Sequence, residues 1–248
     1  LCILSLPGKA FDKEVLLPET TISHRAIQAQ ANTFARVTSA NARNFLAGLE
    51  TAGRQKAGDG TATASATGLD RPAVSQLQAY FQAFEHHFAE AFLDCVPVAG
   101  LAAVDATAAG RFQQQLKRPL RFASRRFASR GSAVTASLYF PPTATVYVNT
   151  RFLAHDPEAF IDAFEHELWH HLLPTVTADT VGDCLWFEGF NEAMSETWSA
   201  CLHRISGSGR RLESKRIEYP VQTAFASLIV GCNRPATINY LLGAIDGR

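Results

Sequence analysis

The stretch that decides the fold reads DPEAFIDAFEHELWHHLLP and covers residues 156–174. Asp156 is a favoured N-cap residue and Pro157 suits the first position of a helix. Pro174 cannot continue a helix, because its ring clashes with the preceding turn. The stretch therefore predicts one helix that begins after Asp156 and ends before Pro174.

Inside this helix, residues 166–170 follow the pattern H-E-x-x-H. Residues i and i+4 project from one face of a helix, so His166 and His170 can bind one Zn²⁺ together. Glu167 can reach a water on that ion and act as its general base. His171 lies about 100° further around the helix. It cannot share the metal, and we expect it to be a packing or substrate-side residue.

A row of acidic residues follows downstream in EGFNEAMSETW, residues 188–198. The periodicity predicts a helix over about residues 190–205, in which Glu188, Glu192 and Glu196 stand one turn apart. Stacked carboxylates repel one another unless a cation offsets the repulsion. A catalytic zinc site takes three protein ligands and keeps one open position, so the row can supply the missing ligand.

The two motifs together resemble those of the gluzincin branch of the zincin metallopeptidases. In that branch the third ligand is a glutamate within N-E-x-x-S-[DE], and residues 191–196 read NEAMSE. The resemblance extends over about residues 135–235. It implies an α+β fold, with a zincin-like catalytic domain built from a small sheet and an active-site helix. It also implies one catalytic Zn²⁺.

The resemblance implies roles for the acidic row. Glu192 is the expected third ligand, and Glu196 is expected to orient the first histidine through its second ring nitrogen. A rival assignment remains, because LWFEGF at 185–190 is similar to the W-L-x-E-G-F pattern of gluzincin aminopeptidases. That pattern assigns Glu188 as the ligand and Glu192 as its support. We favour Glu192, because the rival leaves Ser195 and Glu196 unused.

The implied reaction is zinc-dependent hydrolysis of peptide bonds in a peptide or protein substrate, with Glu167 as general base. Gluzincins often use a downstream Tyr or His to stabilise the oxyanion. Tyr219, which opens a Y-P-x-x-x-x-F-x-x-L pattern, is the expected donor here, and Tyr240 is the second candidate. Two alternatives stay open: a metal-dependent hydrolase of a non-peptide amide, and a non-catalytic binding protein with a degenerate zincin fold.

The whole chain is expected to divide into two parts. Residues 1–98 form a mostly helical N-terminal region, and residues 99–248 form the zincin-like domain. Helices are expected over residues 21–53, ending near Gly53, and from Arg71 to about Cys95. ASLYF at 136–140 and ATVYVNT at 144–150 read as a hairpin. ATVYVNT or its neighbour is the expected edge strand for an extended peptide.

Composition narrows the class of protein. The chain has 248 residues, 47% hydrophobic and 19% charged, which is typical of a soluble globular protein. No apolar run approaches the roughly 18 residues that span a bilayer. Residues 106–155 hold eight bases and no acid, yet the net charge is zero. We therefore expect a solvated basic strand or loop there, not a nucleic-acid surface.

The cysteines and the first residue give little information about the compartment. The five cysteines form no C-x-x-C pair and indicate no disulfide framework. The chain begins with Leu, which favours a processed product and is compatible with a secreted toxin or effector. The sequence assigns no compartment and no oligomeric state.

Overall fold

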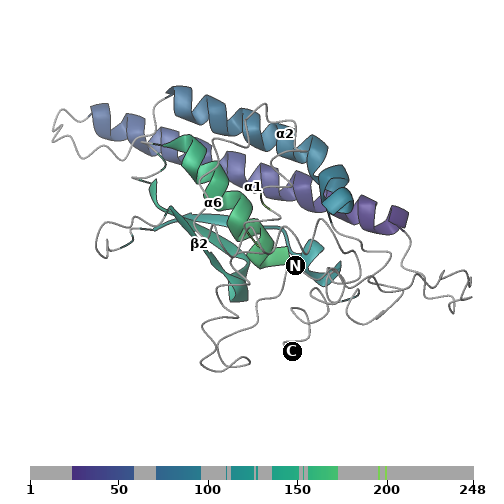
Figure 1. Cartoon of the computed structure of the whole chain (residues 1–248). Helices are drawn as coiled ribbons and strands as arrows, with labels where there is room; N and C mark the ends of the chain where they lie inside the picture. The colour runs from purple at the N-terminus through teal and green to yellow at the C-terminus, as the bar shows by residue number, and fades with distance from the viewer. Residues whose placement is uncertain are drawn as a thin grey trace, which may run out of the picture.

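The computed structural model describes most of the chain up to the predicted metal helix. The described residues are 24–58, 71–95, 110, 113–125, 127, 136–150, 153, 156–172, 195 and 199. Their elements are α1 (His24–Gly58), α2 (Arg71–Cys95), β1 (Arg121–Ser124), β2 (Ser137–Phe140), a 3₁₀ turn (Pro141–Thr143), β3 (Thr145–Val148) and α6 (Pro157–Leu172). This part is mostly helical with one small sheet, so the predicted α+β class is confirmed at that level (Figure 1).

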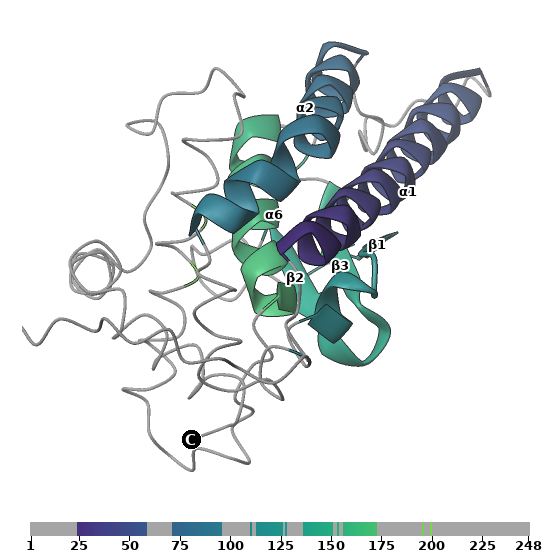
Figure 2. The ribbon, with the colours of Figure 1, turned by 90° about the vertical axis from the view of Figure 1, so that its right-hand side faces the viewer.

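The two long helices lie side by side (Figures 1 and 2). The prediction that the first helix stops near Gly53 is wrong, because α1 continues to Gly58. A glycine inside a helix costs only about 1 kcal/mol relative to alanine. A long helix packed against α2 can absorb that cost, so Gly53 does not end it.

Helix α2 follows the prediction at both ends. One face of the helix is buried as a continuous apolar row of one leucine and five aromatic residues: Leu77, Tyr80, Phe81, Phe84, Phe88 and Phe92. Their spacing of three and four residues places them on one side of the helix. His86 and His87 are exposed on the other side.

The sheet contains the predicted hairpin and one further strand. Strand β2 pairs antiparallel with β3, and the turn Pro141–Thr143 joins them. Strand β1 pairs parallel with β3 on its other side, which gives the order β1-β3-β2. Among the described residues, ATVYVNT therefore forms the central strand of the sheet, and its neighbour β2 is an edge strand.

Strand β1 lies in the basic segment and is positioned by the helical layer. The ring of Phe122 lies 5.7 Å from that of Phe81 and 5.8 Å from that of Phe164, between centroids. Just before the strand, Leu120 donates its N–H to Thr38 and accepts a hydrogen bond from Asn41. Helix α1 thus holds the chain at the point where β1 begins.

Helix α6 packs against both α2 and β2 (Figure 2). Its buried apolar residues belong to the same core as those of α1, α2 and the sheet. The N-terminal helices and the predicted metal helix therefore share one core, and the domain boundary near residue 98 stays a prediction. In the described part of the chain, no helix is both long and apolar enough to cross a membrane.

Candidate metal centre

Local signals hold α6 in place at both ends, as predicted. The carboxylate Oδ1 of Asp156 accepts a hydrogen bond of 2.9 Å from the N–H of Ala159, which is the expected N-cap. Pro157 occupies the first helical position, and the helix ends at Leu172, two residues before Pro174. The H-E-x-x-H motif consequently lies in the last turns of a well-defined helix.

The two motif histidines converge on one face of α6. Nε2 of His166 and Nε2 of His170 lie 2.8 Å apart, and both side chains are half-buried. Two nitrogens that bind one tetrahedral zinc at about 2.0–2.1 Å stand roughly 3.3 Å apart. A small rotation of either side chain covers the difference. The pair therefore fits the ligand role that the sequence predicts.

Glu167 lies on the neighbouring face of α6, which is turned toward the sheet. Its Oε2 accepts a hydrogen bond of 2.8 Å from the backbone N–H of Tyr139 in β2. The sheet register explains why that N–H is available to α6. Asn149 N–H bonds to Ala136 C=O, and in an antiparallel ladder only alternate pairs bond in this way. The N–H of Tyr139, opposite Val146, accordingly points away from β3.

His171 lies one turn beyond Glu167 and is only 1% exposed. Its Nε2 lies 3.0 Å from the carbonyl oxygen of Gln115, and its Nδ1 lies 2.8 Å from the phenol oxygen of Tyr139. A carbonyl only accepts, so Nε2 carries the hydrogen and Nδ1 accepts from the Tyr139 hydroxyl. Of the two roles expected for His171, packing or substrate-side, its burial and its hydrogen bonds favour packing.

Burial sets the charge state of this pair. It lowers the pKa of His171 to about 4, against a smaller opposing effect of the Gln115 carbonyl. It also raises the pKa of Tyr139 to about 12, although the Arg118 guanidinium acts in the opposite direction. At neutral pH the imidazole is uncharged and the phenol keeps its hydrogen, as the hydrogen bond between them requires.

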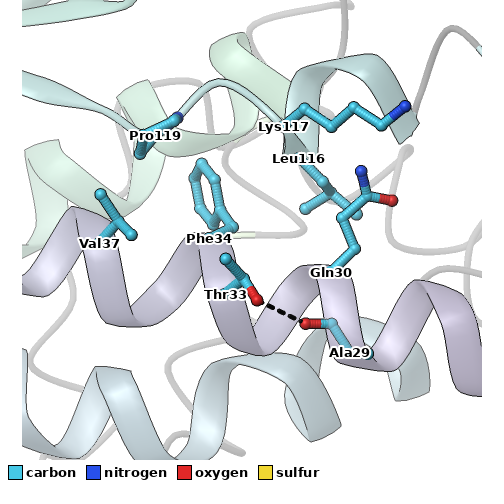
Figure 3. A pocket seen from close by; sticks show the side chains of 8 residues that line it. All are labelled: Ala29, Gln30, Thr33, Phe34, Val37, Leu116, Lys117 and Pro119. Carbon is cyan, nitrogen blue, oxygen red and sulfur yellow. Dashed lines mark hydrogen bonds between the residues drawn. The ribbon is translucent and has the colours of Figure 1, made fainter.

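A groove of about 400 Å³ opens beside this pair, between α1 and the segment that precedes β1 (Figure 3). Its lining is largely apolar and includes Phe34, Val37, Leu116 and Pro119. The ring of Phe34 also stacks on His171, with centroids 5.5 Å apart and planes 10° from parallel. Phe34 thus separates the groove from the buried histidine.

The other predicted site residues lie outside the described residues: Glu188, Glu192, Glu196, Tyr219 and Tyr240. Ser195 and Ser199, from the segment that carries the acidic row, are described, and both are helical and buried. They agree with the helix predicted over residues 190–205. Within the described ranges, no three His, Cys, Asp or Glu side chains gather as a metal site. That part of the chain therefore offers two ligands, His166 and His170.

Sequence reasoning missed Tyr139, which contacts α6 twice. The spacing of Glu167 and His171 could have indicated such a partner. These two residues stand four apart and form a second row on α6, beside the row of His166 and His170 that is predicted to bind metal. The partner of that row comes from a strand about 30 residues earlier, and helical periodicity carries no information about such a partner.

Comparisons of the chain with protein-family models, with curated proteins and with solved structures return no match.

Proposed function

We propose that this chain is a zinc-dependent metallopeptidase of the gluzincin type, with a zincin-like catalytic domain. The observation that carries the proposal is the convergence of His166 and His170, whose Nε2 atoms lie 2.8 Å apart beside Glu167. Helices often carry single histidines for packing, but two facing imidazole nitrogens supply two of the three protein ligands of a hydrolytic zinc site, and the adjacent carboxylate supplies its base.

In this proposal His166, His170 and Glu192 hold the metal, and Glu196 supports the first histidine. Bound zinc supplies a Lewis acid for the scissile carbonyl and an activated water. Glu167 takes a proton from that water and later returns it to the departing amine, so no net proton is consumed in cleavage. Tyr219 is the proposed oxyanion donor, and Tyr240 is the second candidate.

Strand β2 supports a peptide as the substrate. It is an edge strand of the sheet and lies directly against α6. An extended peptide can add to such an edge, beside the H-E-x-x-H helix, through outward backbone groups other than the Tyr139 N–H, which is bonded to Glu167. The hydrogen bond from the Tyr139 amide holds the Glu167 carboxylate next to this strand, which supports the proposal.

The test compares the wild type with Glu167→Gln on an unbiased peptide library, after the zinc content of both proteins has been measured. We expect both to bind one zinc per chain and only the wild type to cleave. Loss of a general base should lower the rate by about 10²–10⁴-fold. Equal products from both proteins would end the peptidase proposal.

Two other outcomes of the same test would point to the alternatives. Bound zinc without any peptide cleavage would favour hydrolysis of a non-peptide amide. Zinc content far below one equivalent would favour a binding protein with a degenerate site.

A further inference from the structure

One residue of β2 contacts both members of the second row on α6. The backbone N–H of Tyr139 donates to Glu167 Oε2 at 2.8 Å, and its hydroxyl donates to His171 Nδ1 at 2.8 Å. Glu167 and His171 stand four residues apart, so they face the same strand. Strand and helix are therefore joined at two points, one of which is the predicted general base.

The imidazole end of this connection is held from three sides. Gln115 accepts from its Nε2, Tyr139 donates to its Nδ1, and the ring of Phe34 stacks on its face. Both ring nitrogens thus have fixed partners, and the side chain is 1% exposed. A side chain constrained in this way can in turn fix the residue that bonds to it.

We propose that Tyr139 and His171 form a positioning pair, which anchors β2 on α6 and thereby holds the Glu167 carboxylate in its working orientation. This inference rests on the proposed function for its kinetic consequence. The pair contacts the Glu167 carboxylate through the backbone N–H of Tyr139, and the two side chains act through that contact. The pair fixes the position of the Tyr139 amide. That amide in turn fixes the orientation of the Glu167 carboxylate plane.

A pair that only fills the core would lower stability when it is altered and leave turnover intact below the melting temperature. A positioning pair predicts a loss of kcat while KM and zinc content stay the same. Misplacement of a reacting group by about 1 Å can cost on the order of 10²-fold in rate. Measuring the changes in kcat and in KM separately therefore distinguishes a positioning pair from a pair that only fills the core.

The kinetic arm uses Tyr139→Phe, His171→Leu and His171→Asn. We expect Tyr139→Phe and His171→Leu each to lower kcat by about tenfold or more. The double variant that combines them should lose little further activity, because each change alone already breaks the same hydrogen bond. Asn places an amide oxygen near the position of Nδ1, so His171→Asn should recover part of the loss. Tyr147→Phe, on the same sheet, is the matched control. Unchanged kcat in the first two variants, or equal kcat for His171→Asn and His171→Leu, would overturn the proposal.

The spectroscopic arm uses the metal-free protein labelled with ¹⁵N-tyrosine. The chain has five tyrosines, and the Tyr139 signal is the one that Tyr139→Phe removes. A charged acceptor strengthens the amide hydrogen bond and shifts its proton downfield, so Glu167→Gln should move it upfield. In a protein that also carries His171→Leu, Glu167→Gln should cause a much smaller upfield shift of the Tyr139 amide proton. An equal change in both backgrounds would contradict the coupling.

The two arms also separate this inference from the proposed function. If the wild type cleaves peptides and the pair variants keep full kcat, the positioning role fails while the peptidase stands. If the wild type cleaves nothing, the peptidase fails. The pair is then supported or overturned by the amide measurement alone.

Discussion

The phenol oxygen of Tyr139 lies 2.8 Å from Nδ1 of His171, and this contact joins an edge strand to the last turn of α6. Both residues are buried, so neither polar group can turn to water when its partner is removed. The stability of the metal-free protein should therefore respond to each of them.

Tyr139→Phe should lower the free energy of unfolding by about 1–3 kcal/mol, because it leaves Nδ1 of His171 buried and unpaired. Urea unfolding of the metal-free protein measures the change. Tyr147→Phe removes a hydroxyl from a half-exposed position on β3 and should stay within about 0.5 kcal/mol of the wild type. Equal effects would show that the buried contact contributes nothing specific.

Acid should destabilise the metal-free protein through His171. Its pKa lies near 4 in the folded state, below the ordinary value of 6.5, so between these values the unfolded chain binds more protons. The contribution of neutral His171 to the free energy of unfolding is fully present above pH 6.5. As the pH falls toward 4, the free energy of unfolding decreases by at most roughly 3 kcal/mol. Unfolding midpoints at pH 7 and pH 5 should differ less in His171→Asn than in the wild type. The same difference in both proteins would contradict this assignment.

The N-cap of α6 should contribute measurably to stability. Asp156→Ala removes the acceptor of the Ala159 N–H and should cost about 1 kcal/mol. Asp156→Ser keeps a capping oxygen and should retain most of the stability. Thermal unfolding of the two variants side by side gives the comparison. Equal melting temperatures would mean that the cap is dispensable.

The aromatic core should be sensitive at Phe164, which is fully buried and whose ring lies 5.0 Å from that of Phe81. Phe164→Ala should cost about 3–5 kcal/mol through lost burial and a residual cavity. Phe140→Ala is the matched control, because Phe140 is 43% exposed on the outer sheet face and should cost far less. Comparable losses at both positions would contradict the core described above.

Zinc should stabilise the protein against heat. A ligand that binds only the folded state, present at about 100 times its dissociation constant, contributes about 2.7 kcal/mol. The zinc-induced rise in melting temperature should vanish in His170→Ala. It should also vanish in Glu192→Gln and persist in Glu188→Gln, if Glu192 is the third ligand. The reverse result for the two glutamates would transfer that role to Glu188.

Local signals in the sequence were enough to predict several elements. Asp156 and Pro157 marked the start of α6 and Pro174 marked its end, and the helix runs from Pro157 to Leu172. The β-branched and aromatic residues of ASLYF and ATVYVNT also predicted two adjacent strands, which β2 and β3 confirm. Each of these features depends on residues within one or two turns of each other, which is the range that a sequence pattern reports.

Three features depended on contacts between distant residues. Strand β1 exists as part of the sheet because Phe122 packs among aromatic rings from α2 and α6, and no local pattern indicated its parallel pairing with β3. Helix α1 passes Gly53, since its packing outweighs a weak local preference. The Tyr139 amide reaches Glu167 only after the sheet register has turned it outward.

The sequence by itself determined that His166 and His170, the proposed metal ligands, share one face, because a helix places residues four apart on one face whatever surrounds it. It also determined the helix that carries His166, Glu167 and His170. Only the tertiary structure decided that Glu167 and His171 meet the same strand, and that β2, not β3, forms the edge beside them. Strand order and cross-layer contacts are set by packing between segments far apart in the chain, which no local spacing encodes.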